Sequence, residues 1–226
     1  MKLSFALAAV ILAGAALPVA KAEAAAYSFT SAPVSVDTQL SLGFTFTANA
    51  NFNVTSLGYY DFLGDGFLTP HDVGIFLGDG ASGPGPLLAS TTLAAGTSGT
   101  LGPNDFRYQA IAPLALIAGQ TYTIAGLSPN IGVNDAWVYG GPVEVTGFTV
   151  DPQITIPLNA ARFVYFPPGG VLTDPSNHFA DYQFYAVNFN GSTSIPEPAT
   201  WALLLAGLAG LGAARRARGR MASPAA

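Results

Sequence analysis

The chain has 226 residues, enough for one β-domain with a substantial core, and its composition excludes several classes of protein. It contains no cysteine, which rules out disulfide bonds, thiolate catalysis and cysteine-based metal sites. Charged residues make up only 9% of the chain, against roughly 25% in average soluble domains. Arg107 and Arg162 are the only lysine or arginine residues between Tyr27 and Thr193, where acidic residues are numerous. Such a surface repels a phosphate backbone, so no nucleic acid partner is expected.

The N-terminal end predicts a secretory signal peptide over residues 1–26. Lys2 gives a short basic start, and Leu3–Leu17 forms an apolar run that is too short to span a bilayer comfortably. Small residues follow, with cleavage sites after Ala24 or Ala26. We therefore expect a signal helix that directs the chain to the secretion translocon and is removed by signal peptidase. The alternative is a buried helix or an uncleaved anchor.

The C-terminal end, residues 194–220, has three parts in a fixed order. The motif Pro196, Glu197 and Pro198 comes first, and an apolar run over about 199–214 follows it. In a helix this run would rise about 24 Å, slightly less than a hydrocarbon core of roughly 30 Å. The run therefore predicts a single transmembrane helix.

The side chains of this end also fit a membrane anchor that stops in the inner membrane. A tryptophan lies near the outer interface and a cluster of arginines stays on the cytoplasmic side. The predicted anchor residues are Trp201, Leu203, Leu204, Leu205, Leu208 and Leu211. The predicted stop-transfer residues are Arg215, Arg216, Arg218 and Arg220.

Over Ile195–Arg220 the chain resembles the PEP-CTERM sorting signal of Gram-negative bacteria, and all three parts of that signal match. The resemblance implies recognition by an exosortase, a membrane cysteine transpeptidase that cleaves near the Pro-Glu-Pro motif. It also implies anchoring in the inner membrane before processing. Proteins with this signal come typically from bacteria that make exopolysaccharide and biofilm matrix. A plain membrane anchor that carries Pro-Glu-Pro is the alternative.

Residues 27–193 predict one all-β domain, an antiparallel β-sandwich or jelly-roll. Short alternating or β-branched runs are separated by turns such as Gly-Asp-Gly at 64–66 and 78–80, and no run has helical periodicity. The predicted strands cover 40–47, 52–60, 73–77, 87–93, 121–125, 154–156, 162–165 and 182–189.

Part of this domain, about Phe46 to Ile124, resembles a β-sandwich module of unknown function in bacterial extracellular proteins. The resemblance rests on Leu57–Asp61, on the strand that begins at His71 and on Leu116–Tyr122. It implies no activity. Alternation along these strands predicts the core residues Leu57, Tyr59, Val73, Ile75, Leu87, Tyr122 and Ile124. Three glycines predict close approaches or a turn with positive φ, namely Gly58, Gly74 and Gly119.

Acidic residues and one histidine around the first Gly-Asp-Gly turn are candidate ligands for a cation. Asp61, Asp65, His71 and Asp72 supply oxygen and nitrogen donors, and Asp79 is a further candidate for Ca²⁺. The regular spacing of an EF-hand is missing, so solvated turn acids are the alternative. A histidine that bonds to a turn is the alternative for His71.

The sequence holds no known catalytic motif, and we do not expect an enzyme. Exposed aromatic side chains could instead stack on sugar rings. The candidates are Tyr60, Phe62, Phe67, Trp137, Tyr139 and Tyr185, and for each of them a place in the core is the alternative. Asn53 and Asn190 match the N-glycosylation pattern, the second in a predicted linker. A chance match explains both, and modification of Asn190 in the linker is the alternative.

These features together predict a non-enzymatic protein of the cell surface or extracellular matrix with a structural or adhesive role. An association with exopolysaccharide or biofilm is expected from the C-terminal end. A carbohydrate-binding module is the alternative, and a secreted hydrolase is a weaker one.

Overall fold

The computed structural model describes residues 23–35, 39–80, 83–129, 135–141, 144–158, 160–179 and 183–192. Every strand pair within these ranges is antiparallel, and none of the described residues is in an α-helix. Three single turns of 3₁₀ helix occur at η1 (Phe62–Gly64), η2 (Pro103–Asp105) and η3 (Pro168–Gly170). The all-β prediction is confirmed. The predicted signal helix and membrane helix lie outside the described residues.

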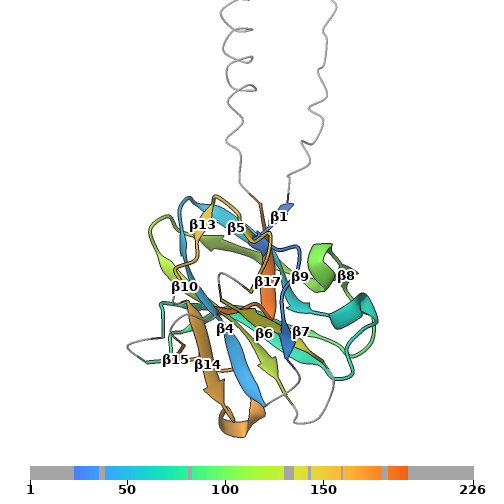
Figure 1. Ribbon diagram of the computed structural model, residues 1–226. Coiled ribbons are helices and arrows are strands. Elements are labelled where there is room, and N and C mark those ends of the chain that lie inside the picture. Colours follow the sequence, from blue (N-terminus) through green and yellow to red (C-terminus); the bar gives the residue numbers. More distant parts are fainter. Residues whose placement is uncertain are drawn as a thin grey trace, which may run out of the picture.

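The first large sheet brings the two ends of the described chain together (Figure 1). Its strands follow the order β1 (Glu23–Ala25), β17 (Val187–Ser192), β5 (Phe52–Tyr60), β9 (Phe106–Leu116) and β8 (Thr100–Leu101). Glu23 lies opposite Ser192 in the β1·β17 ladder. The β-body thus begins four residues before the boundary at Tyr27 that the sequence predicted.

The second large sheet contains the longest uninterrupted ladder among the described residues, between β4 and β10. Its main path is β15 (Asn177–His178), β14 (Ala161–Tyr165), β4 (Leu40–Ala48), β10 (Thr121–Ser128), β6 (His71–Leu77) and β7 (Leu87–Leu93). A further strand, β13 (Ile154–Thr155), also pairs with β4. β15 and β7 are the two edge strands of this path.

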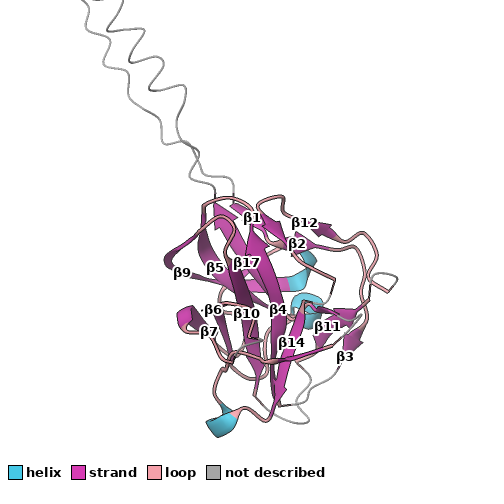
Figure 2. Cartoon of the chain, turned by 90° about the vertical axis from the view of Figure 1, so that its left-hand side faces the viewer, coloured by secondary structure: helices cyan, strands magenta, loops and turns pink. Residues whose placement is uncertain are grey.

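Two small sheets lie beside the main strands, as Figure 2 shows for β2, β12, β3 and β11. One joins β16 (Gln183–Phe184), β11 (Trp137–Gly140) and β3 (Val34–Ser35). The other joins β12 (Thr149–Val150) and β2 (Tyr27–Ser28).

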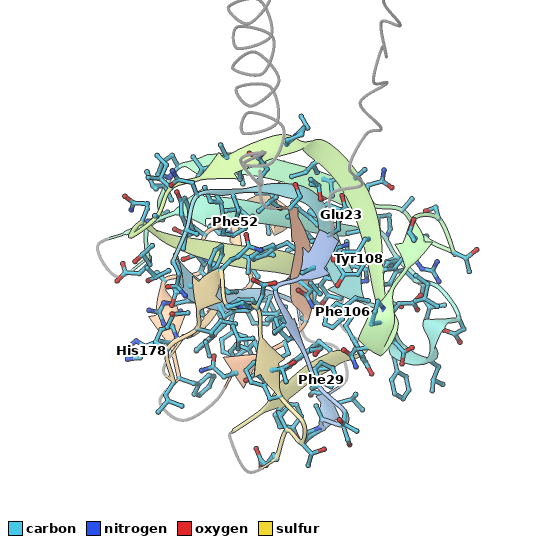
Figure 3. All side chains as sticks on the ribbon, turned by 90° about the horizontal axis from the view of Figure 1, so that it is seen from above. Glu23, Phe29, Phe52, Phe106, Tyr108 and His178 are labelled. Carbon is cyan, nitrogen blue, oxygen red and sulfur yellow. The ribbon has the colours of Figure 1, made fainter. Side chains whose placement is uncertain are left out.

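Aromatic side chains from both large sheets share one core, which makes the body sandwich-like. Phe46 of β4 meets Phe189 of β17 with ring centroids 5.1 Å apart, and Tyr27 packs edge-on against Phe44 and Phe106. Figure 3 shows side chains filling the space between the strands, with His178 at the periphery. Burying this apolar surface is the main stabilising contribution to the fold.

The predicted core is confirmed for all but one residue. The buried members are Leu57, Tyr59, Val73, Ile75, Tyr122 and Ile124. Leu87 is wrong, because its side chain is 48% exposed. It belongs to β7, an edge strand whose residues are mostly exposed, so alternation along the strand does not bury it.

The glycine predictions are confirmed by the packing. A Cβ at Gly58 would lie 2.6 Å from the ring of Tyr108, and one at Gly74 would lie 2.7 Å from the side chain of Leu87. Both positions therefore allow a neighbouring side chain to approach the backbone closely. Gly119 has φ of 80°, as expected for the turn between β9 and β10.

Candidate functional site

His71, the first residue of β6, is fully buried and has protein partners at both ring nitrogens. Nδ1 lies 3.0 Å from the carbonyl oxygen of Leu127, and Nε2 lies 3.1 Å from Oδ2 of Asp135. Its ring stacks on Tyr59 at 4.1 Å and meets the edge of Phe67 at 4.9 Å. Both polar partners are acceptors, so the ring donates from both nitrogens only when it is protonated. This histidine is built into the core.

The Asp135 carboxylate fixes the turn that leads into β6. It accepts hydrogen bonds from the backbone nitrogens of Leu68 at 2.9 Å and Thr69 at 3.0 Å, and from the Thr69 hydroxyl at 3.2 Å. Burial alone raises the pKa of Asp135. The hydrogen bonds from His71, Leu68 and Thr69 outweigh burial and hold that pKa below its ordinary value. The ionised carboxylate is therefore stabilised by the fold.

A second buried charge pair joins Asp61 to Arg107. Oδ2 of Asp61 lies 2.7 Å from Nε and 2.6 Å from Nη2 of Arg107, so one carboxylate oxygen accepts from both nitrogens. Oδ1 of Asp61 accepts a hydrogen bond from the backbone of Gly66 at 2.9 Å. The guanidinium also donates to the carbonyl oxygens of Thr97 and Gly64. The pair therefore ties the loop after β5 to β9.

The predicted metal ligands do not come together. Asp61 is paired with arginine, His71 faces Asp135, and the carboxylate of Asp72 accepts a hydrogen bond from a threonine hydroxyl at 2.6 Å. Asp65 lines a pocket beside η1. Among the described residues, no group of three or more His, Asp or Glu side chains could hold a metal ion. The cluster that the sequence predicted is therefore not formed, with or without Asp79.

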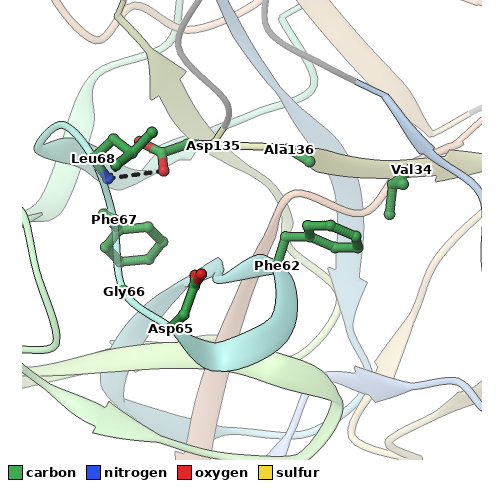
Figure 4. A pocket seen from close by; sticks show the side chains of 8 residues that line it. All are labelled: Val34, Phe62, Asp65, Gly66, Phe67, Leu68, Asp135 and Ala136. Carbon is green, nitrogen blue, oxygen red and sulfur yellow. Dashed lines mark hydrogen bonds between the residues drawn. The ribbon is translucent and has the colours of Figure 1, made fainter.

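The pocket lies beside η1 and has a volume of about 560 Å³. Figure 4 shows Phe62 and Asp65 on one side of it and the hydrogen bond between Leu68 and Asp135 on another. It is lined by Val34, Phe62, Asp65, Gly66, Phe67, Leu68, Asp135 and Ala136. Its size and mixed lining are in the range of small-molecule sites.

Most aromatic residues that the sequence proposed for sugar stacking belong to the core instead. Four of the six are buried, namely Tyr60, Phe67, Trp137 and Tyr185. Tyr139 is half-buried, and Phe62 is 37% exposed at the pocket. Buried rings cannot stack on a soluble sugar, so for those four the alternative, a place in the core, is confirmed.

Exposed aromatic rings occur elsewhere, on and after β14, where the sequence did not predict them. Phe163 stacks on Phe179 at 4.6 Å and meets Tyr165 at 5.1 Å, and Phe166 lies next to Tyr165 at 6.5 Å. Tyr165, Phe166 and Phe179 are 50%, 60% and 41% exposed. We call these four residues the aromatic surface cluster. Phe166 has φ of 47°, a strained conformation for a bulky residue, and such strain often accompanies function.

The linker predicted around Asn190 needs a correction. This residue lies in β17 and not in a linker, and its side-chain nitrogen donates to the hydroxyl of Ser56 at 3.0 Å. Asn53 is a half-buried residue of β5. Asn53 and Asn190 therefore both belong to strands of the first large sheet.

The sorting and anchor residues predicted at the C-terminal end, from Pro196 to Arg220, lie outside the described residues. In the ranges that the structure does describe, no helix is both long enough and apolar enough to cross a membrane. The case for sorting therefore rests on the sequence.

Comparison with known proteins identifies this end. Residues 194–218 match the family model described as the PEP-CTERM protein-sorting motif. No curated protein matches the chain. The matched segment starts two residues after β17 ends at Ser192. The motif indicates export, a membrane-anchored sorting signal and processing by an exosortase. The chain therefore carries a PEP-CTERM sorting motif directly after a β-rich body, and it is targeted to the surface or the exterior of the cell.

Proposed function

We propose that the protein is a structural or adhesive component of the cell surface or extracellular matrix, associated with exopolysaccharide or biofilm. The single observation that carries this proposal is the sorting motif at residues 194–218, which follows the β-body almost directly. The chain would leave the cytoplasm through the secretion translocon. A helix over about 199–214 would then hold it in the inner membrane until an exosortase cleaves at Pro196–Pro198.

A non-catalytic role agrees with how the polar core groups are used. His71 and Asp135 bind each other and the backbone, and Asp61 and Arg107 do the same. A general acid or base must reach a substrate, whereas these groups are buried among protein partners. Their contacts support a role in holding loops, and we assign the protein no enzyme activity.

The test of this proposal is processing in the native host. The double variant Pro196→Ala with Glu197→Ala should remain in the inner membrane with its C-terminal helix, whereas the unaltered protein should lose that helix and reach the surface or the medium. Intact mass and cell fractionation measure both. Identical mass and location for the two proteins would refute the proposal that an exosortase processes the chain at this motif.

A second candidate function is carbohydrate binding, and the aromatic surface cluster favours it. The C–H faces of sugar rings pack on aromatic faces, and three rings of the cluster, Tyr165, Phe166 and Phe179, are exposed. The half-buried Phe163 stacks on Phe179 with an interplanar angle of 19° and holds that ring in place. Asn177 lies opposite Phe163 in the β14·β15 ladder, which places an amide on the same face of the sheet. Rings and amide together would suit an uncharged polysaccharide.

Binding of the host's purified exopolysaccharide tests this second function. Tyr165→Ala and Phe179→Ala should each weaken binding about tenfold, in line with roughly 1–1.5 kcal/mol for a lost aromatic contact. Ile117→Ala is the matched control, because Ile117 is also exposed, at 64%, but lies outside the cluster. An equal loss in all three variants, or no saturable binding at all, would exclude the cluster as a sugar site.

A further inference from the structure

We infer that signal peptidase cleaves this chain between Ala22 and Glu23, and not after Ala24 or Ala26. The inference rests on the proposed export by a signal peptide and adds the site of cleavage. It starts from three overlapping Ala-x-Ala triplets, each of which satisfies the sequence rule for cleavage. They are Ala20–Ala22, Ala22–Ala24 and Ala24–Ala26. The sequence does not choose among them, but the residues that follow each cut have different places in the fold.

Glu23–Ala25 form β1, so two of the three cuts would remove part or all of a strand. β1 pairs with the end of β17, from Glu23 opposite Ser192 to Ala25 opposite Asn190. Without β1, the outer side of β17 would become an unpaired sheet edge, which proteins usually protect. The cut after Ala22 is the one that leaves β1 complete.

Ala26 is also built into the body, since it is only 1% exposed. Its nitrogen donates to the carbonyl oxygen of Phe189 at 2.9 Å and to Oδ1 of Asn188 at 3.1 Å. Its own carbonyl oxygen accepts from the nitrogen of Asp151 at 3.0 Å. A cut after Ala26 would delete these three bonds, and their partners in the body would each lose one hydrogen bond.

The new N-terminal charge gives an independent reason. Hydrolysis of the peptide bond adds water and leaves a carboxylate on one residue and an ammonium group on the next. After Ala26 that ammonium would be on Tyr27, which is 1% exposed, and burying an unpaired charge is strongly unfavourable. After Ala22 it would be on Glu23, which is exposed.

Signal peptidase acts on an unfolded chain, so the fold does not steer the enzyme. The fold decides which product is complete: a chain that begins at Glu23 keeps the ladder with β17 and puts its charge in water. The two processing sites, Ala22–Glu23 and Pro196–Pro198, would then flank the two strands that pair at this edge.

Intact mass and N-terminal sequencing of the full chain, expressed with its own signal in a Gram-negative host, test the inference. The mature protein should begin at Glu23. Ala20→Phe places a bulky residue three positions before this cut only, so it should abolish the Glu23 start. Ala24→Phe is the matched variant, because it blocks the cuts after Ala24 and Ala26 and should leave the Glu23 start unchanged.

The N-terminal residue of the product distinguishes the possible outcomes. A mature N-terminus at Ala25 or Tyr27, sensitive to Ala24→Phe and insensitive to Ala20→Phe, would overturn the site while keeping the signal peptide. A chain that keeps Met1 in all three proteins would instead refute the signal peptide on which the inference rests. Neither readout depends on whether the variants fold, because cleavage precedes folding.

Discussion

Asn188 and Ala26 are joined by a buried hydrogen bond of 3.1 Å between the side chain at one end of the β-body and the backbone at the other. The same amide oxygen accepts from the nitrogen of Phe189, and the amide nitrogen donates to the carbonyl oxygen of Tyr27 at 3.0 Å. Asn188 therefore holds the N-terminal segment against β17, where the protein leads into its sorting motif.

Replacing this side chain should destabilise the body. Asn188→Ala leaves the nitrogen of Ala26 and the carbonyl oxygen of Tyr27 with fewer partners in a buried place, and we expect a loss of about 2 kcal/mol. Asn51→Ala is the control, because Asn51 also accepts a backbone hydrogen bond but is exposed. Urea unfolding measures both, and equal losses would show that Asn188 has no special part in holding the N-terminal segment.

The second prediction concerns the loss of stability when the buried pair of Asp61 and Arg107 is broken. Arg107→Met removes the guanidinium and leaves a carboxylate that is 1% exposed without its countercharge, so the free energy of unfolding should fall by about 3–5 kcal/mol. Adding Asp61→Asn should recover part of this loss, because the buried charge is then gone. A single variant within about 1 kcal/mol of the unaltered protein would contradict this account of the pair.

Stability should depend on pH through Asp135. Its pKa is lower in the folded chain than in the unfolded one, so its contribution to stability is present above the ordinary value of about 3.9 and is lost as pH falls through the folded pKa. Asp135→Asn should therefore destabilise the protein at pH 7 and much less at pH 3. Asp72→Asn, near the surface, should change stability by no more than about 0.5 kcal/mol at pH 7. An equal loss of stability for Asp135→Asn at pH 3 and at pH 7 would show that the ionised carboxylate of Asp135 does not stabilise the fold.

Asp174 should change stability with pH in the opposite direction. Burial raises its pKa, and the backbone hydrogen bond from Gly85 and the charge of Arg162 only partly offset this effect. Its Oδ1 is buried with no hydrogen-bond partner among the described residues. A raised folded pKa means that stability is lost as pH rises through that pKa.

Asp174→Asn removes the ionisation and keeps an oxygen for the Gly85 nitrogen, which lies 2.6 Å from Oδ2. The melting temperature at pH 7 should rise by about 2–4 °C, and the gain should vanish at acid pH. A lower melting temperature at pH 7 would show that the charge of Asp174 is needed by its surroundings.

The sequence predicts the class of this fold better than its polar contacts. Alternating runs and glycine turns identify most strands of the second sheet, and even the positive φ of Gly119 follows from the turn that it occupies. They miss β9, the longest strand of the described residues, and β11. The error at Leu87 arises because the edge position of β7 depends on which strands pair, and those strands are far apart in the chain. Alternation along one strand carries no information about its neighbours.

The contacts of the charged residues are less accessible from sequence for the same reason. Arg107 lies 46 positions from Asp61, and Asp135 lies 64 from His71, so spacing indicates neither pair. Arg107 is one of two arginines in an acidic domain, and this scarcity was the one available signal for the first pair. The sorting motif is different, because it is a linear signal and can be read without a fold.

The measurement that tests the central claim most directly is the intact mass of the protein from its native host, with and without the exosortase. The account predicts a surface or secreted species that ends near Pro196–Pro198 when the enzyme is present. It predicts a membrane-bound species that keeps the arginines from Arg215 onward when the enzyme is absent. A full-length C-terminus in the inner membrane of both strains would contradict it, and the protein would then have a simple membrane anchor.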